Sequence, residues 1–202
     1  MESKYPIYGI DAFRNLSWGS HICHFYHSTD ELLEIVLPFL EAGLEQNQFC
    51  VWVIPETLSP LKAQELLARE IPGVEEFLKK RALAILQEEE VYSVRGPDRA
   101  QKIIELWLQR FNDGLRRGFT GMRVAGHCPY NAPLESIRRY EREVDRVIGK
   151  YKIIAVCAYA VERFSVAQAI EAGCLHEKSF MKKRGDWESI PRATYAAVKD
   201  RL

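Results

Sequence analysis

The segment Ile153-Ile-Ala-Val-Cys-Ala-Tyr-Ala160 is the most apolar run in the chain, and the interpretation of the fold starts from it. A short run in which apolar side chains do not alternate with polar ones is typical of a strand that is buried on both faces of a sheet. Four further strands are predicted from runs upstream, at His21–Tyr26, Phe49–Ile54, Ala82–Gln87 and Met122–Ala125. The sequence therefore predicts a sheet that lies inside the domain.

Helical segments separate these strands. Their signals are N-terminal capping residues and apolar side chains at spacings of three and four. The helices are predicted to begin at or just after Ser28, Ser59, Asp98, Leu134 and Ser165. Strands that alternate with helices of this length pair in parallel, and right-handed crossovers place helices on both faces of the sheet. We therefore predict an α/β fold, a three-layer sandwich around a mostly parallel central sheet.

The composition describes one globular unit of 202 residues, with 47% hydrophobic residues and 28 basic side chains balanced by 28 acidic ones. A net charge of zero gives no electrostatic reason to expect nucleic acid as a partner. The apolar runs fall short of the ~20 residues that cross a membrane, and the N-terminus lacks the pattern of a secretion signal. Five widely spaced cysteines suit a reducing compartment better than a disulfide scaffold. A cytoplasmic protein that binds neither nucleic acid nor a membrane is expected.

Three motifs of common enzyme classes are absent from the sequence. The chain has no G-x-x-x-x-G-K-[ST] (Walker A) loop after its first strand, no G-x-G-x-x-G and no G-x-S-x-G. It therefore lacks the lysine and backbone amides that hold nucleotide phosphates, and the sharp turn that presents a nucleophilic serine. We expect that the protein is not an enzyme, and the sequence itself requires no cofactor.

Aromatic, imidazole and carboxylate side chains follow or end several of the predicted strands. In open α/β sheets, ligands bind outside the carboxyl ends of the strands. Small-molecule sites are mostly apolar and contain a few polar groups, which matches the residue types found there. The predicted ligand contacts, gathered in one hollow, are Phe25, Tyr26, His27, Glu56, His127, Tyr130 and Tyr159.

The segment between His21 and His27 is rich in imidazole and thiol groups, which are common metal ligands. Its two ends lie roughly 20 Å apart on an extended strand, so one ion cannot use the whole segment. No zinc-type spacing of cysteines and histidines is present, and the simpler prediction is no metal. The alternative is a metal or thiol-redox sensor that combines ligands from distant parts of the chain, namely Cys23, His24, His127 and Cys128, with Cys157 and His176 as further candidates.

Arg123 lies in an otherwise apolar predicted strand. A buried guanidinium group needs partners, because an unpaired charge in the interior is costly. Glu141 and Glu143, on the following helix, are the predicted partners in a structural ion pair.

Several short motifs occur in a fixed order along the chain. They are H-I-C-H-F-Y (21–26), P-F-L-E-A-G-L (38–44), F-C-V-W-V-I (49–54), R-V-A-G (123–126), C-A-Y (157–159), Phe164 and His176. From about Trp18 to Lys183, the chain resembles the MEDS domain, the sensory domain of methanogen and methylotroph regulators. The matching positions of the family are His21, Cys23, Phe25, Tyr26, Arg123, Gly126, Tyr159 and His176.

The resemblance implies a RecA/KaiC-like fold that has lost its nucleotide loop, in agreement with the missing Walker A motif. It also implies a non-catalytic sensor of small molecules such as hydrocarbon derivatives, acting in signal transduction or transcriptional regulation. This chain departs from the family pattern at His127, where many relatives have an acidic residue, and at Tyr130, where they have tryptophan. The third alternative is a degenerate nucleotide-binding protein on the same scaffold.

The resemblance also divides the chain. Residues 1–17 are expected to be an N-terminal extension, residues 18–183 the sensory domain, and residues 184–202 a charged tail in which a helix could begin at Pro191. No effector module is recognised before Trp18 or after Lys183. Signalling is therefore expected to pass through a separate effector protein, either a kinase or a DNA-binding regulator, or through self-association as a homodimer.

Overall fold

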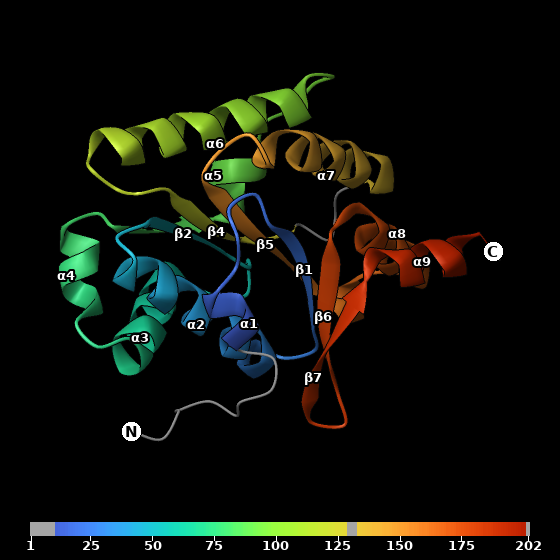
Figure 1. The fold of residues 1–202 in the computed structure, drawn as a ribbon, viewed down its shortest axis with the longest axis horizontal. Coiled ribbons are helices and arrows are strands. Elements are labelled where there is room, and N and C mark those ends of the chain that lie inside the picture. The colour runs from blue at the N-terminus through green and yellow to red at the C-terminus, as the bar shows by residue number, and fades with distance from the viewer. Residues whose placement is uncertain (1–10, 129–132, 201–202) are drawn as a thin grey trace.

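The computed structural model describes residues 11–128 and 133–200, which form one sheet covered by helices (Figure 1). Within this part of the chain, seven strands are ordered β3-β2-β4-β5-β1-β6-β7. Their bounds are β1 His21–Tyr26, β2 Phe49–Ile54, β3 Leu83–Gln87, β4 Met122–His127, β5 Ile153–Ala160, β6 Lys178–Lys183 and β7 Asp186–Pro191. Every neighbouring pair is parallel except β6 with β7. The predicted α/β class and mostly parallel sheet are confirmed.

Helices cover both faces of the sheet. Their bounds are α1 Asp11–Arg14, α2 Thr29–Glu45, α3 Pro60–Glu70, α4 Val74–Lys79, α5 Glu88–Tyr92, α6 Arg99–Arg116, α7 Leu134–Ile148, α8 Val166–Leu175 and α9 Arg192–Lys199, with a 3-10 turn at Val161–Arg163. Helices α1 to α4 lie on one face, here called face A, and α5 to α8 lie on the other, face B (Figure 1). The three predicted layers are therefore present. The sequence did not predict the short helices α4 and α5.

The central strands are buried along nearly their whole length, as the apolar runs predicted. Alternate side chains enter opposite cores. On β1, Ile22 and Tyr26 belong to the core under face A, whereas Cys23 and Phe25 belong to the core under face B. In the parallel register Cys23 lies opposite Cys157 of β5, so these two thiols are on the same face.

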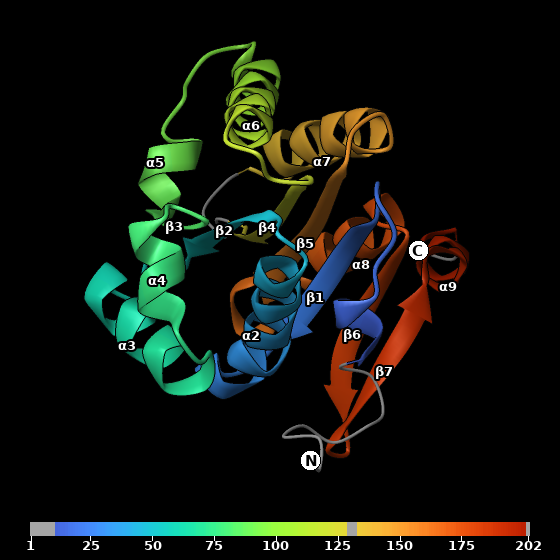
Figure 2. The same cartoon turned by 60° about the vertical axis from the view of Figure 1, so that its left-hand side comes forward.

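The C-terminal segment is part of the fold and is not a charged tail. Residues 186–191 form β7, which pairs antiparallel with β6 at the edge of the sheet opposite β3 (Figure 2). The Lys182 ammonium and the Trp187 indole N–H both donate to Glu34 of α2, at 2.7 and 2.8 Å, which fixes this hairpin to face A. The helix that follows, α9, begins at Arg192 and packs on α8, where a Cβ at Gly173 would lie 2.4 Å from the ring of Tyr195.

The segment just before residue 18 is also part of the core. Phe13 of α1 is fully buried among the side chains under face A. Its backbone carbonyl and that of Arg14 accept hydrogen bonds from Arg123 of β4, at 3.0 and 2.9 Å. Residues 11–17 therefore complete the domain instead of extending from it.

Arg123 is a buried cation that has no carboxylate partner among the residues that the structure describes. Its guanidinium group donates to the side-chain oxygen of Gln48 at 2.6 Å and to the carbonyl of Phe39 at 3.1 Å, in addition to the two α1 carbonyls. The predicted ion pair with Glu141 or Glu143 is wrong, because Arg123 points to face A whereas α7 covers face B. Gly43 makes room for this side chain, since a Cβ there would lie 2.8 Å from its Cδ.

Replacing Arg123 tests how much this network contributes. Arg123→Lys keeps the charge but removes the planar fork that reaches several acceptors at once, and we expect a loss of about 3 kcal/mol in the free energy of unfolding. Urea denaturation measures it. The control is Arg146→Ala, an exposed partner of Glu143, which should cost less than about 1 kcal/mol. Equal losses in the two variants would contradict the role given to Arg123.

Candidate functional site at the carboxyl edge of the sheet

A chain of hydrogen bonds joins the carboxyl ends of four strands on the face A side. The Tyr26 hydroxyl lies 2.8 Å from Nε2 of His127, and Nδ1 of His127 lies 2.6 Å from a carboxylate oxygen of Glu88. The same oxygen accepts the backbone N–H of Glu56 at 3.1 Å. Because a carboxylate only accepts, Nδ1 of His127 donates to it, and Nε2 then accepts from Tyr26. Burial raises the pKa of the Tyr26 hydroxyl well above its ordinary value, which keeps this donor protonated.

The predicted ligand contacts do not share one hollow. Tyr26 and His127 lie on the face A side, with the exposed Glu56 beside them and bound to Arg163 at 2.9 Å. Phe25 and Tyr159 pack together on face B, with ring centroids 5.8 Å apart.

The sheet itself separates these two groups, because successive residues of a strand point to opposite faces. The side chain of His27 is exposed, and Tyr130 lies outside the described residues. The prediction of a single hollow is therefore wrong.

Two adjoining cavities lie on face B. The first, here called the edge cavity, has a volume of about 300 Å³ and is lined by Tyr92, Arg99, Cys128, Ser136, Ile137 and Tyr140, among others. The second, the apolar cavity, has a volume of about 50 Å³ and lies between β4 and β5 and the helices α6 and α7; its walls include Ile104, Trp107, Val124, Val144, Ile148 and Ala155. Tyr92 and Tyr140 line both cavities. Gly126 of the family motif lines the apolar one.

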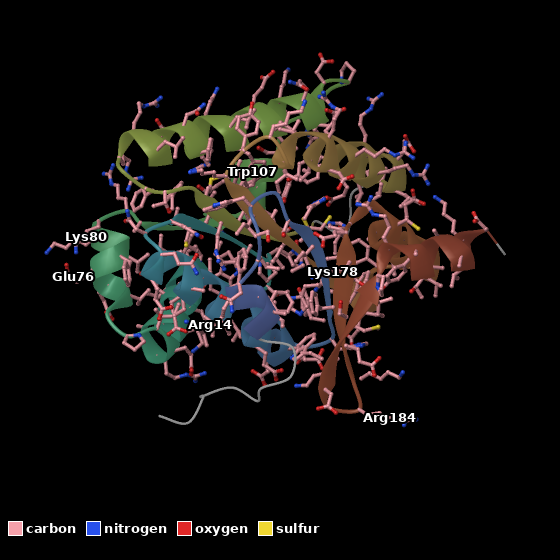
Figure 3. All side chains as sticks on the ribbon, viewed as in Figure 1. Arg14, Glu76, Lys80, Trp107, Lys178 and Arg184 are labelled. Atoms are coloured by element: carbon pink, nitrogen blue, oxygen red, sulfur yellow. The ribbon has the colours of Figure 1, made fainter. Side chains whose placement is uncertain are left out.

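Sequence reasoning missed most of this lining. Trp107 and Tyr140 lie on the apolar stripes of α6 and α7, which predicted only core packing, and Tyr92 lies on the unpredicted helix α5. The indole N–H of Trp107 donates to the Tyr140 hydroxyl at 3.0 Å, which places a polar pair in an otherwise apolar wall. Figure 3 shows Trp107 on the inner side of α6, toward the sheet.

The alternative metal ligands do not form a set. Cys23 and His24 point to opposite faces of β1, and His127 is engaged with Tyr26 and Glu88. His24 is fully buried against the Trp187 ring, at 5.1 Å between centroids, and neither of its ring nitrogens has a hydrogen-bond partner among the described residues. Burial raises the pKa of Cys23 well above its usual value, as it does for Cys128, which leaves these thiols protonated.

Three residues of the family motifs surround Glu141, which the sequence analysis assigned as a partner of Arg123. Glu141 of α7 is fully buried on face B and accepts the Tyr159 hydroxyl at 2.7 Å. His21 and His176 approach the other oxygen of this carboxylate, at 3.2 and 3.5 Å. A signal for Glu141 was present, because it lies four residues after Ile137 and three before Val144, on the buried stripe of the helix.

The loop after β1 differs in charge from a phosphate-binding loop. The Ser28 hydroxyl accepts the backbone N–H of Glu31, and the Glu31 carboxylate accepts the backbone N–H of His27 at 2.8 Å. Asp30 and Glu31 both lie in the first turn of α2. A helix N-terminus attracts anions, but here carboxylates of the chain already occupy that position and would repel a phosphate.

The strand order, the two helical layers and the altered loop define a RecA-like α/β domain without a Walker A motif. The flagellar accessory protein FlaH from Methanocaldococcus jannaschii has a similar fold, with a TM-score of 0.58 and 10% identity over 85% of this chain and 76% of that chain. The chain belongs to the MEDS family, described as the methanogen/methylotroph DcmR sensory domain, whose sequence model matches residues 20–177. No curated protein matches the sequence. None of the helices in the described residues is long and apolar enough to cross a lipid bilayer.

The buried His24 imidazole is expected to make stability depend on pH. Burial lowers its pKa from 6.5 to about 3, so in mildly acidic solution the unfolded chain binds a proton there that the folded chain does not. The free energy of unfolding therefore falls as the pH drops below 6.5, and His24 contributes about 2 kcal/mol of the loss between pH 7 and pH 5.

Urea denaturation of the His24→Phe variant at both pH values checks this, because the aromatic replacement has no proton to bind. Its unfolding free energy should fall by about 2 kcal/mol less than that of the unmodified chain. His27→Phe, in the exposed position after β1, is the control and should leave the pH dependence unchanged. Parallel pH profiles for His24→Phe and the unmodified chain would show that His24 does not contribute.

Proposed function

We propose that this chain is a non-catalytic sensory domain that binds a small apolar molecule in the apolar cavity between β4, β5, α6 and α7. The observation that carries the proposal is the lining of this cavity, which consists largely of aliphatic and aromatic side chains with two tyrosine hydroxyls. Small-molecule sites have this composition, in which the apolar surface supplies affinity and a few polar groups set orientation. The family's description as a sensory domain supports the proposal.

The size of the cavity limits the ligand. At about 50 Å³ it is smaller than the roughly 150 Å³ of an engineered apolar cavity that admits benzene in another protein. A molecule of one to about three heavy atoms, such as a halogenated or short hydrocarbon derivative, fits this volume. The edge cavity, which shares Tyr92 and Tyr140 with it, is the proposed route of entry from the carboxyl edge.

The titratable groups of the apolar cavity support a role without chemistry. Burial raises the pKa values of Tyr92 and Tyr140, which both line it, well above their ordinary ranges. These groups stay protonated at neutral pH and supply neither a general base nor an activated nucleophile. Binding would therefore act by shifting a conformational equilibrium.

Arg99 of α6 connects helices α5 and α7, so it can pass a movement of the cavity walls to the surface. Its guanidinium group donates to the Ser136 hydroxyl of α7 at 2.7 Å and to the backbone carbonyl of Tyr92 at 3.0 Å. A ligand that moves α6 against α7 would change these contacts at the surface. In this proposal the change is received by a separate effector protein, a kinase or a DNA-binding regulator, or by a second copy of the chain.

Small apolar probes test the proposal directly. Dichloromethane and xenon should shift the NMR signals of the methyl groups of Val124 and Ile148 in a saturable manner, because both side chains line the apolar cavity. Ala155→Leu fills the cavity and should weaken probe binding at least about tenfold, while the melting temperature changes little.

Ala167→Leu adds the same atoms on the exposed side of α8 and should leave probe binding unchanged. Equal affinity in the two leucine variants, or no saturable shift in the unmodified chain with either probe, would refute the proposal.

A degenerate nucleotide-binding protein would be stabilised by Mg-ATP, and our proposal predicts that this chain is not. Because Asp30 and Glu31 occupy the start of α2, millimolar Mg-ATP is expected to leave the melting temperature unchanged. Differential scanning fluorimetry with Mg-ATP measures this, and sodium chloride at matched ionic strength is the control. A concentration-dependent rise with Mg-ATP alone would favour the degenerate nucleotide-binding protein.

A further inference from the structure

A group of four potential metal ligands lies beside the apolar cavity on face B. His21 of β1, Glu141 of α7, Cys157 of β5 and His176, which follows α8, place one ligand atom each within 4.8 Å of the others. All four side chains are buried. Of the ligands considered from the sequence, the group contains the further candidates Cys157 and His176 and none of the four named first.

Four of the six distances between ligand atoms of the group are close to those of a tetrahedral ion site. With zinc–ligand distances of about 2.0–2.1 Å for nitrogen or oxygen and about 2.3 Å for sulfur, ligand atoms are about 3.3–3.6 Å apart. Nε2 of His21 lies 3.2 Å from Oε2 of Glu141 and 3.5 Å from Sγ of Cys157. Oε2 of Glu141 lies 3.8 Å from Sγ of Cys157 and 3.5 Å from Nε2 of His176.

The orientation of His176 requires a positive charge or a proton inside the group. Its Nδ1 lies 2.7 Å from the carbonyl of Ala172, which can only accept, so Nδ1 carries the proton. With the proton on Nδ1, Nε2 presents a lone pair. That lone pair faces the Glu141 carboxylate and has no hydrogen-bond donor among the described residues. A cation between the two acceptors resolves this conflict.

A hydrogen bond orients the carboxylate of the group. Oε1 of Glu141 is taken by the Tyr159 hydroxyl, which leaves Oε2 directed into the group. Nδ1 of His21 lies 3.7 Å from Asp145, beyond hydrogen-bond distance, and has no hydrogen-bond partner among the described residues. A hollow of about 400 Å³ lined by His21, Asp145 and Arg192, among others, gives a route from the surface.

We propose that His21, Glu141, Cys157 and His176 bind one divalent first-row transition-metal ion, with tetrahedral Zn²⁺ the best match. The charges balance, since one thiolate and one carboxylate offset a divalent cation and both imidazoles bind as neutral ligands. Binding releases the Cys157 thiol proton to solvent and forms the sulfur–metal bond, and the metal displaces the proton that lies between Nε2 of His21 and Glu141 in the metal-free protein. The site shares Cys157 with the wall of the apolar cavity, but it is tested by metal binding alone, so either proposal can fail without the other.

Cobalt titration of the full chain, without an affinity tag and after treatment with a chelator and a reductant, tests the site. The unmodified protein should bind one Co²⁺ per chain, with the intense visible bands of a tetrahedral ion and a sulfur-to-cobalt charge-transfer band. Cys157→Ala should abolish the charge-transfer band and weaken binding at least about 100-fold. Tyr159→Phe, which removes the hydrogen bond that orients Glu141, should weaken binding about 10- to 100-fold.

The matched control is Cys23→Ala. Cys23 is buried, lies opposite Cys157 in the register and points to the same face, but is not in the group. This variant should keep the stoichiometry and spectrum of the unmodified protein. A charge-transfer band that persists in Cys157→Ala, or that is lost equally in Cys23→Ala, would overturn the assignment.

X-ray absorption of the zinc-loaded, unmodified protein tests the site without any substitution, so misfolding of a variant cannot affect the result. It should show one sulfur and three nitrogen or oxygen neighbours. A shell without sulfur, a shell with more than one sulfur, or the absence of stoichiometric binding at micromolar metal would refute the proposal.

Discussion

The structure depends on a parallel sheet whose central strands are shielded from water on both faces. Inside such a sheet a polar side chain must find its partner within the protein, because no solvent is available to replace it. The strands β1 and β4 nevertheless carry His21, His24, Arg123 and His127, all of which are buried. Each of these four side chains is accommodated in a different way. Arg123 binds a neutral amide and backbone carbonyls, His127 connects a tyrosine to a carboxylate, and His21 faces Glu141, whereas His24 is kept neutral by burial.

The same burial explains which strands could be predicted from the sequence. Strands that are buried on both faces, such as β2 and β5, are continuous apolar runs and stand out from the rest of the chain. The edge hairpin of β6 and β7 does not, because its exposed positions carry lysines and acids, and its pairing is fixed by distant contacts such as Trp187 with Glu34. The short helix α5 gave no periodic signal in five residues.

The structure separates the residues that the sequence analysis placed together in one site. Tyr26, Glu56 and His127 do lie together at the carboxyl edge. Tyr26 and Phe25 do not, because successive side chains of a strand point to opposite faces of the sheet. This alternation can be read from the sequence, and it separates the predicted ligand contacts into two groups. Glu88 was missed because it follows β3, whose sequence is less apolar than that of β2. Contacts such as that between Glu141 and His176 join residues far apart in the chain, and their distances come only from the packed helices.

The start of α2 carries carboxylates, whereas face B holds an apolar cavity and a buried group of potential metal ligands. The apolar cavity and the four-ligand group both lie there, and Cys157 borders the one and belongs to the other. A metal ion that holds the Cys157 sulfur fixes one wall of the cavity, and a molecule in the cavity contacts that same wall. Any free-energy coupling between the two must be reciprocal, since each ligand changes the affinity for the other by the same factor. A single side chain shared by two sites can therefore connect them without a long pathway through the domain.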